Sequence, residues 1–511
     1  MIDKHIPLWQ RFSLYAVAGG LSLGGYLFAS IFIFGNTGFP LDDAWIHQTY
    51  ARNFVFLGKW CFVPGEPSAG STSPMWTLLL AIGHRVGLGP YWWAFFLGWV
   101  SLFALALIGY LVFPFLYIGG EKHAFWAGML LLFEWHIVWA SGSGMETSWF
   151  SVMVLIVALV TLMKFKKDIT YPLLSGENSP NKSSHCFIFG LIIGLSTWFR
   201  PEGLTLLGPV ILLLIIVNLD WKQKARLVSF LLIGFAIFVL PYLYFNVSLS
   251  GGIFPNTFYA KQGEYNILLE SPIWMRMVRQ LSVMLVGVGI LLLPGFVFFI
   301  YHSINFKHWE NLVWVGWLLG YGVIYALRLP VTYQHGRYLI PAMPLYFLFG
   351  FAGFCMVIQR YLSLDRWKFI GKTWIASTII VELLFWTLGA RAFAVDVTII
   401  ESEMVTVAKW INQNTPTDAL IAAHDIGALG YFSNRKLLDL AGLVNPEVIP
   451  FIRDEAALRR YLDDKGADYL VTFPSWYPSL IQGKKKIYQT NSQISLLQGG
   501  ENLEVYLWKI R

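Results

Sequence analysis

Two adjacent carboxylates, Asp42 and Asp43, are the residues of this chain whose position most directly suggests chemistry. They stand near the start of residues 40–76, just after the first long apolar segment. Because hydrocarbon disfavours ionised carboxylates, an acidic pair beside a membrane span is more often a functional site than an accident. Such a carboxylate can take the proton of a hydroxyl nucleophile. One of the two can also cap the following helix, and both roles are compatible because a cap needs only one side chain.

Four later loops also carry polar and ionisable residues between apolar segments. Their cations suit a phosphate group, to which Arg offers bidentate contact. Their carboxylates can position those cations. Together with His47 of the first loop, the candidate residues are Glu146, Arg200, Glu202, Tyr259, Lys261, Tyr333, His335, Arg337 and Tyr338.

Structural roles remain open for each of these residues. Glu146 suits the first turn of a helix, where the helix dipole stabilises a carboxylate. Arg200 and Glu202 can form a local ion pair in a short turn, and Lys261 can be a solvated loop charge. Tyr and Arg side chains at residues 333–338 also suit anchors at a membrane interface.

The composition indicates a polytopic membrane protein. Of the 511 residues, 56% are hydrophobic and 13% are charged, whereas soluble globular chains carry about 25% charged residues. The net charge of +7 is expected to reflect Lys and Arg in cytoplasmic loops, not a nucleic-acid-binding surface. The three cysteines, Cys61, Cys186 and Cys355, show neither metal-site nor disulfide spacing.

Eleven apolar segments are predicted to cross the membrane, although the fifth is short for a hydrocarbon core of about 30 Å. The first is long enough to be a retained anchor and not a cleaved signal peptide. Lys4 and Arg11 precede it, which places the N-terminus in the cytoplasm, and with eleven spans every polar loop then lies on the opposite face. Residues 75–86 are too short to span and are expected to be interfacial or re-entrant. The segments are approximately 12–34, 92–117, 125–140, 149–165, 187–199, 204–217, 227–247, 281–301, 312–327, 339–358 and 374–393.

A change of pattern after residue 393 divides the chain into two predicted domains. Residues 1–393 form a mostly α membrane domain, with residues 36–91 as its first external loop. Residues 394–511 are predicted to be a small extracytoplasmic α/β domain, because an amphipathic helical pattern at 401–413 precedes short apolar runs that alternate with helices. Asp425 and Asp439 lie beside glycines in this domain, and a structural role in turns is expected for those glycines.

Short motifs along the chain resemble one family in the same order. LDDAWIHQTYARNF, a PGE loop and GSTSPMWTLLLA are similar to the first external loop of bacterial polytopic glycosyltransferases of the GT-C class. SGMETSWF, RPEG, PNTFYAK, HGRYLIPAMPL and IGALGYF with LDLAGLV then follow in the family's order. The resemblance is closest to mycobacterial arabinofuranosyltransferases that use a lipid-linked donor, and membrane mannosyltransferases are more distant. It covers most of the chain and rests on the ordered set of motifs.

The resemblance implies a GT-C fold and the inverting transfer of a sugar from a polyprenyl phosphate to an acceptor hydroxyl on the outer face of the membrane. In that class an Asp at the start of the first external loop is the general base, which corresponds here to Asp42 or Asp43, with Asp42 preferred. The candidates for binding the donor phosphate are Arg337, His335, Lys261 and Arg200. The candidates for binding the sugar or acceptor are Glu146, Glu202, Tyr333, Tyr259 and His47.

No cofactor is expected from the sequence. The chain shows no Walker-type or G-x-G-x-x-G phosphate loop on its cytoplasmic side, which favours a lipid-linked donor over a nucleotide sugar. Asp42 and Asp43 can share a divalent metal, but a further carboxylate at ligand spacing is lacking. His47 and His335 also lack metal-ligand spacing. The expected partners are a polyprenyl-phosphate sugar, the bilayer of the inner or plasma membrane, and a glycan, lipid or protein acceptor, but no nucleic acid.

A polytopic lipid or glycan transporter, or a flippase, is the alternative function. Charges near the membrane also mark transport pathways, but transporters tend to show inverted repeats and broken spans at the midplane. The charges of this chain are instead predicted to collect at one boundary. A scaffold protein that binds through its outer domain is a third class, and it predicts that the Asp pair can be replaced without loss.

Overall fold

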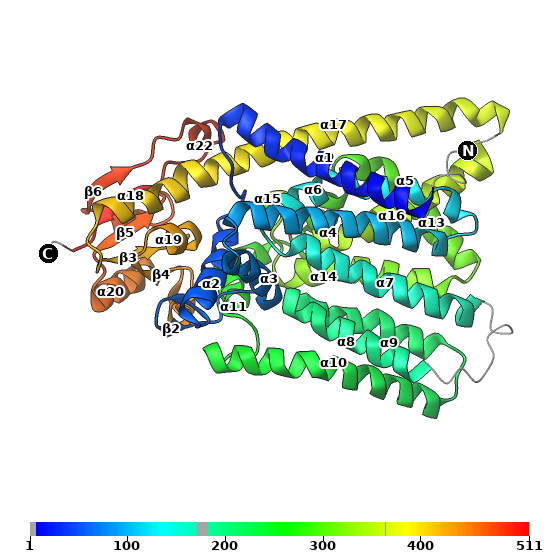
Figure 1. Ribbon diagram of the computed structural model, residues 1–511, viewed down its shortest axis with the longest axis horizontal. Coiled ribbons are helices and arrows are strands. Elements are labelled where there is room, and N and C mark those ends of the chain that lie inside the picture. The colour runs from blue at the N-terminus through cyan, green and yellow to red at the C-terminus, as the bar shows by residue number, and fades with distance from the viewer. Residues whose placement is uncertain (1–6, 171–181, 363, 510–511) are drawn as a thin grey trace.

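A computed structural model describes residues 7–170, 182–362 and 364–509 of the chain. Lys4, which contributes to the predicted orientation of the N-terminus, lies outside the described residues. Figure 1 shows an elongated molecule in which long helices form a bundle and a small domain of strands and short helices lies at one end. Helix α17 (Lys368–Ile400) runs along the bundle and leads into the small domain.

Each of the eleven predicted apolar segments is helical. Within the described residues, seven helical segments are long and apolar enough to cross a membrane, and α5 with α6 adds an eighth if this pair, bent by 57°, is one span. Glu134 lies at the bend and caps α6 by accepting the N–H of Ile137 at 3.0 Å. The chain is thus a membrane protein, and eleven spans stay a prediction. The bundle contains α1 (Leu8–Phe34), α4 (Pro90–Val112), α5 (Ala124–Phe133), α6 (Trp135–Gly142), α7 (Thr147–Thr170), α8 (Lys182–Phe199), α9 (Leu207–Ile216), α10 (Trp221–Ser250), α13 (Val288–Asn305), α14 (Trp309–Arg328) and α16 (Met343–Val357).

Glycines bring helix α8 directly against α10. A Cβ atom at Gly190 would lie 2.0 Å from the carbonyl oxygen of Leu231, and one at Gly234 would lie 2.2 Å from that of Phe187. Small residues let helix backbones approach closely in a bilayer, where packing holds helices together in place of the hydrophobic effect. This close pair fixes the end of α8, so Arg200, which follows α8, is held at the end of the bundle that faces the small domain.

Short elements from two parts of the chain lie between the bundle and the small domain (Figure 1). They are α2 (Asp43–Leu57), the hairpin of β1 (Cys61–Val63) and β2 (Glu66–Pro67), α3 (Pro74–Arg85) and α11 (Asn256–Glu264). Helix α3 has 12 residues and is too short to cross the membrane, as predicted for residues 75–86. The N–H of Asn256 donates to the carbonyl oxygen of Ala69 at 3.0 Å, which ties α11 to the first external loop.

The small C-terminal domain has the predicted α/β architecture. Its sheet has the strand order β4-β3-β5-β7-β6, in which β3 pairs in parallel with β4 and β5, and β7 pairs antiparallel with β5 and β6. The predicted boundary after residue 393 falls inside one helical segment, Lys368–Asn414, because residues 390–414 contain no Gly or Pro that would end the helix. The elements are α18 (Thr406–Asn414), β3 (Leu420–Ala423), α19 (Gly427–Phe432), β4 (Lys436–Asp439), α20 (Glu455–Lys465), β5 (Tyr469–Thr472), β6 (Lys485–Gln489) and β7 (Glu504–Leu507).

Candidate active site

A cavity of about 220 Å³ lies where α2, α11, α14 and the segments before α7 and α9 meet. Eight of the twelve candidate residues line it, namely Asp43, His47, Glu146, Arg200, Glu202, Lys261, Arg337 and Tyr338. The four that lie elsewhere are Asp42, Tyr259, Tyr333 and His335. The cavity therefore brings together loops that are far apart in the sequence, as the polar motifs predict. Its wall also has an apolar part, which includes Leu204, Phe254, Phe258, Ile324 and Leu329.

Asp43 faces two cations in this cavity. Its Oδ2 lies 2.6 Å from Arg337 Nη2 and 3.1 Å from Lys261 Nζ. Burial alone would raise the pKa of the Asp43 carboxyl, but the positive charges of Lys261 and Arg337 hold that pKa well below its ordinary value. Asp43 is therefore ionised at neutral pH, and its two partners are groups that can also bind a phosphate.

The ring of Tyr338 holds three cations close to one another. The guanidinium carbons of Arg337 and Arg200 lie 5.1 and 5.8 Å from the ring centroid, and Lys261 Nζ lies at 5.8 Å. Such contacts attract a cation to the face of an aromatic ring. Among the described residues, the buried Nη1 of Arg337 has no hydrogen-bond partner, so this guanidinium keeps one donor for a ligand.

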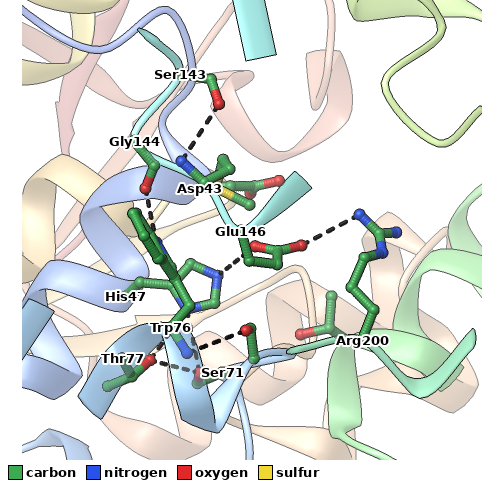
Figure 2. Close-up of polar contacts among 12 residues, drawn as sticks. Asp43, His47, Ser71, Trp76, Thr77, Ser143, Gly144, Glu146 and Arg200 are labelled. Carbon is green, nitrogen blue, oxygen red and sulfur yellow. Dashed lines mark hydrogen bonds and ion pairs between the residues drawn. The ribbon is translucent and has the colours of Figure 1, made fainter. Parts of the chain in front are cut away.

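A second network joins Arg200 to two glutamates and to His47, and Figure 2 shows the part of it that links Arg200, Glu146 and His47. Arg200 Nη1 donates to Glu146 at 3.1 Å, and its Nε and Nη2 donate to Glu202 at 3.3 and 3.2 Å. Tyr325 Oη also donates to Glu202. Glu146 Oε2 lies 3.6 Å from His47 Nε2. The local pair of Arg200 and Glu202 that the sequence allows is present, and Glu146 extends it into a network that reaches α2.

His47 orients this network as a neutral ring. Its Nδ1 lies 3.1 Å from Ser71 Oγ and 3.2 Å from Thr77 Oγ1, and Figure 2 shows the ring between these hydroxyls and Glu146. Burial lowers the pKa of His47, in spite of the nearby Glu146 carboxylate. A neutral imidazole has one donor and one acceptor nitrogen, so His47 connects the first external loop to Glu146 without adding a charge.

Asp42 contacts the small domain and not the cavity. Its Oδ2 accepts the N–H of Gly427 at 2.7 Å and its Oδ1 accepts that of Ala428 at 2.8 Å. The Asp42 side chain makes no cap for α2, the helix that the sequence predicts it to cap. It binds the first two N–H groups of α19 instead. Burial and the negative charge of Asp425 raise the pKa of the Asp42 carboxyl to about 8, against the effect of the two amide hydrogen bonds.

The other three candidates that lie outside the cavity make hydrogen bonds and ring contacts with residues elsewhere. His335 Nε2 lies 2.8 Å from Asp396 Oδ2, and two Trp rings lie edge-on to the His335 ring. Tyr333 donates to the hydroxyl of Tyr265 at 2.7 Å. Tyr259 lies edge-on to the ring of its chain neighbour. None of these contacts places the three side chains beside Asp43.

The described residues contain no group of three or more His, Cys, Asp or Glu side chains arranged to hold a metal ion. Asp42 and Asp43 use their oxygens for different partners: backbone amides of the small domain for Asp42, and side-chain cations for Asp43. The expectation that no cofactor is required stays a prediction.

The chain has similarities of two kinds to known proteins. The small domain matches a family described as a domain of unknown function (DUF8728) over residues 396–506. No curated protein matches the sequence. Among solved structures, ArnT from Cupriavidus metallidurans bound to undecaprenyl phosphate is similar with a TM-score of 0.60, 13% identity and 98% of each chain covered.

Two further solved structures are similar over most of this chain. The oligosaccharyltransferase of Archaeoglobus fulgidus, in complex with Zn and sulfate, has a TM-score of 0.64 and 12% identity over 92% of this chain and 69% of that one. The arabinofuranosyltransferase AftD from Mycobacteria has a TM-score of 0.52 and 13% identity over 98% of this chain and 40% of that one. The chain therefore has the GT-C fold. The fold implied by the ordered motifs is confirmed.

In this GT-C fold the small domain brings His424 to α11 and Asp425 within electrostatic reach of Asp43, although neither residue lines the cavity and the sequence analysis singled out neither for this place. His424 Nε2 lies 3.4 Å from Glu264 of α11, the helix that also carries Lys261 to Asp43. Burial raises the pKa of Asp425 to about 6; the charges of Asp43 and Glu264 add to this effect, and the charge of His424 opposes it. The signal was available, because both residues directly follow β3 and ligand sites of parallel sheets form outside the carboxyl ends of their strands.

The sequence analysis also did not assign two tyrosines, Tyr325 and Tyr338, to the cavity. Tyr325, which donates to Glu202, lies on α14, inside an apolar segment where a Tyr attracts no attention in the sequence. Tyr338 was recognised only as part of an aromatic and cationic cluster, whereas its ring contacts three cations of the cavity. The carboxylate of Asp439 accepts the N–H groups of residues 441 and 444 and so holds the turn that follows β4.

Proposed function

We propose that this protein is an inverting glycosyltransferase that moves a sugar from a polyprenyl phosphate to an acceptor hydroxyl. One observation carries the proposal: Asp43 lines the cavity with Lys261 and Arg337 at 3.1 and 2.6 Å. This arrangement supplies a base for the hydroxyl and positive charge for a leaving phosphate. The GT-C fold supports it, and the similar ArnT was solved with undecaprenyl phosphate bound.

The reaction needs one base and a cationic leaving-group site. The acceptor oxygen attacks the anomeric carbon on the face opposite the phosphate, and the bond between that carbon and the phosphate oxygen breaks. The hydroxyl proton passes to the Asp43 carboxylate, and the electron pair of the broken bond stays on the polyprenyl phosphate. Arg337, Lys261 and Arg200 stabilise the negative charge that this phosphate gains. The phosphate is already a good leaving group, so a general acid is not required.

The contacts of Asp43 make it a base that the donor itself activates. Without a donor, Lys261 and Arg337 neutralise Asp43 and keep its pKa low. A bound phosphate competes for the same two cations and uses the free Nη1 of Arg337. As the cations turn to the phosphate, the pKa of Asp43 rises toward its ordinary value, because an opposite charge nearby is what lowers it.

The remaining residues of the cavity have supporting roles in this proposal. Glu146 and Glu202 position Arg200 and accept hydrogen bonds from sugar hydroxyls, and Asp425 orients the acceptor from the side of the small domain. Asp42 docks the small domain, so we assign the base to Asp43 and not to Asp42, which the sequence resemblance favours. The apolar part of the cavity wall accepts the start of the polyprenyl chain.

The orientation of the protein follows from its charges. Three cations, Lys222, Lys224 and Arg226, open α10 at the end of the bundle away from the small domain. Lys and Arg collect on the cytoplasmic side of membrane proteins. We therefore place the small domain and the cavity on the extracytoplasmic face of the inner or plasma membrane, and the N-terminus in the cytoplasm.

The test is release of polyprenyl phosphate by the purified protein in nanodiscs. Short-chain polyprenyl phosphates carrying arabinofuranose, mannose, galactose or rhamnose serve as donors. Asp43→Asn should lose a factor of about 10²–10⁴ in release while it still binds the donor. Asp42→Asn is the matched control, because the side chain at position 42 is adjacent in sequence but does not line the cavity. This variant should keep most of the activity.

Two results would contradict this proposal. Loss of release in Asp42→Asn with normal release in Asp43→Asn would show that the base is Asp42. No release from any donor, together with full function of both variants in cells, would refute a transferase and favour transport or a scaffold role.

A further inference from the structure

A second cavity, of about 260 Å³, lies between the membrane domain and the small domain. Its volume is slightly below the range of about 300–1,000 Å³ that is typical of sites for drug-sized ligands, so it suits one small unit of a ligand. Three parts of the chain enclose it: the β1–β2 hairpin with the residues after it, the junction of α10 and α11, and the loop that follows β4. The lining residues are Val63, Glu66, Pro67, Ser68, Leu249, Asn256, Val444, Asn445, Pro446 and Glu447.

The polar groups of this second cavity suit a neutral ligand. Carboxylates, side-chain amides and one hydroxyl line it, and none of its ten lining residues that the structure describes is Lys, Arg or His. An anion would meet Glu66 and Glu447 without a lining cation to balance its charge, which is unfavourable at short range. Neutral hydroxyl groups, by contrast, can donate to the carboxylates and accept from the amides.

Several of these groups are free to bind. Asn256 is 3% exposed, and its buried Nδ2 has no hydrogen-bond partner among the described residues. Glu66 is exposed on the hairpin. Glu447 is fixed in place by one of its two oxygens: Oε1 accepts a hydrogen bond from Tyr461 at 3.0 Å and lies 3.5 Å from Lys465. A buried polar atom without a partner calls for an explanation, and a bound ligand next to Asn256 supplies one.

The second cavity adjoins the cavity that contains Asp43. Residues 67 and 68 line the second cavity, while Gly70 and Thr72 line the first. The start of α11 is divided in the same way, with Asn256 on the second cavity and Thr257 on the first. Thr257 Oγ1 donates to the carbonyl oxygen of Gly70 at 2.9 Å, and this contact forms part of the wall between the two cavities. A chain of linked units can therefore have one unit in each cavity.

We propose that the second cavity binds a neutral sugar unit of the acceptor, next to the unit whose hydroxyl is attacked at Asp43. The acceptor is then a carbohydrate chain, and not a peptide or an anionic lipid headgroup. This inference rests on the proposed transferase function for the role of the sugar, but the binding of a neutral sugar can be measured without turnover.

The binding test uses saturation-transfer NMR with the full-length protein in nanodiscs. The probes are the methyl glycosides of arabinofuranose, mannose, galactose and rhamnose, with methyl glucuronide as the anionic probe. Glu66→Trp fills the cavity from the exposed hairpin, so it leaves the buried core unchanged. Lys59→Trp, on an exposed position of the same loop that does not line the cavity, is the matched control.

At least one neutral glycoside should receive saturation from the wild type and from Lys59→Trp, and lose the signal in Glu66→Trp, while the glucuronide gives none. In the transfer assay, Glu66→Trp should raise the KM for a glycan acceptor, and Lys59→Trp should leave this KM unchanged. An equal signal in Glu66→Trp and Lys59→Trp, or no binding of any neutral glycoside, would overturn the proposal. Binding of the glucuronide as well as the neutral probes would also overturn it.

Three further outcomes separate this inference from its alternatives. Thermal stabilisation by Ca²⁺ that is lost in Glu66→Gln, without glycoside binding, would assign the cavity to a divalent cation and refute the sugar site. Glycoside binding that depends on Glu66 in a protein that releases no polyprenyl phosphate would refute the transferase and support the sugar site. Release of polyprenyl phosphate without glycoside binding would refute only the sugar site.

Discussion

Replacement of Arg200 by Met should destabilise the protein strongly, because it leaves buried carboxylates without a cation. Arg200 is 8% exposed and Glu146 is 1% exposed. Arg200 makes one hydrogen bond to Glu146 and two to Glu202. Removing one partner of a buried ion pair costs about 3–5 kcal/mol, since the other charge remains without compensation. Met keeps the apolar stem of the side chain and removes all of its donors.

The free energy of unfolding can be measured for each variant by reversible denaturation in mixed micelles. Arg226→Met is the control, because Arg226 is exposed at the other end of the bundle, and its effect should stay within about 0.5 kcal/mol. Adding Glu146→Gln to Arg200→Met removes the orphaned charge. The double variant should therefore recover part of the loss, with a coupling free energy between the two sites of about 1–3 kcal/mol.

The same variants separate stability from donor binding. If Arg200 binds the donor phosphate, the double variant is folded but still releases less polyprenyl phosphate than the wild type. Equal destabilisation by Arg200→Met and Arg226→Met would refute the energetic role of the buried network. Additive losses in the double variant would show that Arg200 and Glu146 do not stabilise each other.

The contact between the two domains gives three further tests. Asp42→Ala removes the cap of α19 and should cost about 1–2 kcal/mol, seen as faster amide exchange in α19 but not in α10; unchanged exchange would contradict the docking role. Gly427→Ala should loosen the same contact, because a Cβ there would lie 2.0 Å from the carbonyl oxygen of Asp42; a wild-type melting temperature would argue against this close approach. Although burial alone would lower the pKa of His424, Glu264 and Asp425 raise it above its ordinary value. The stabilisation from protonated His424 is then complete below about pH 6.5 and is lost as pH rises through the raised pKa, so melting temperature should fall with pH more steeply in the wild type than in Glu264→Gln; equal slopes would refute this contribution.

Local signals in the sequence were sufficient to predict the apolar helices of the bundle and the alternating helices and strands of the small domain. Helix α20 is an example, since Asp454 caps its N-terminus and Gly466 adopts the left-handed conformation after its C-terminus. The end of the helical segment Lys368–Asn414 could not be predicted from hydropathy. Apolar character ends near residue 393, but the helix continues to Asn414, because hydropathy records where the chain leaves an apolar environment and not where backbone hydrogen bonding stops.

The motifs predicted which loops meet, but not the direction of each side chain. At the start of a helix, the side chains of neighbouring residues point about 100° apart around the helix axis. Asp42 and Asp43 therefore cannot share one role. The partner that separates them is α19, whose Gly427 lies 385 positions from Asp42 in the chain, and no local pattern could reveal it. His335 differs from the prediction for a related reason. Its φ of 57° is an uncommon left-handed value for a residue other than Gly, and its side chain contacts Asp396 instead of the cavity.

Helix α11 makes the chemistry of Asp43 depend on the position of the small domain. Lys261 and Glu264 are three residues apart on this helix and therefore lie on neighbouring positions of one face. Lys261 contacts Asp43, and Glu264 contacts His424 of the small domain. A shift of the small domain that pulls on Glu264 also changes the distance between Lys261 and Asp43, and with it the pKa of the proposed base. Because the small domain also closes the second cavity, the proposed acceptor unit bound there would stabilise the arrangement in which Asp43, its cations and the hydroxyl of the acceptor are together.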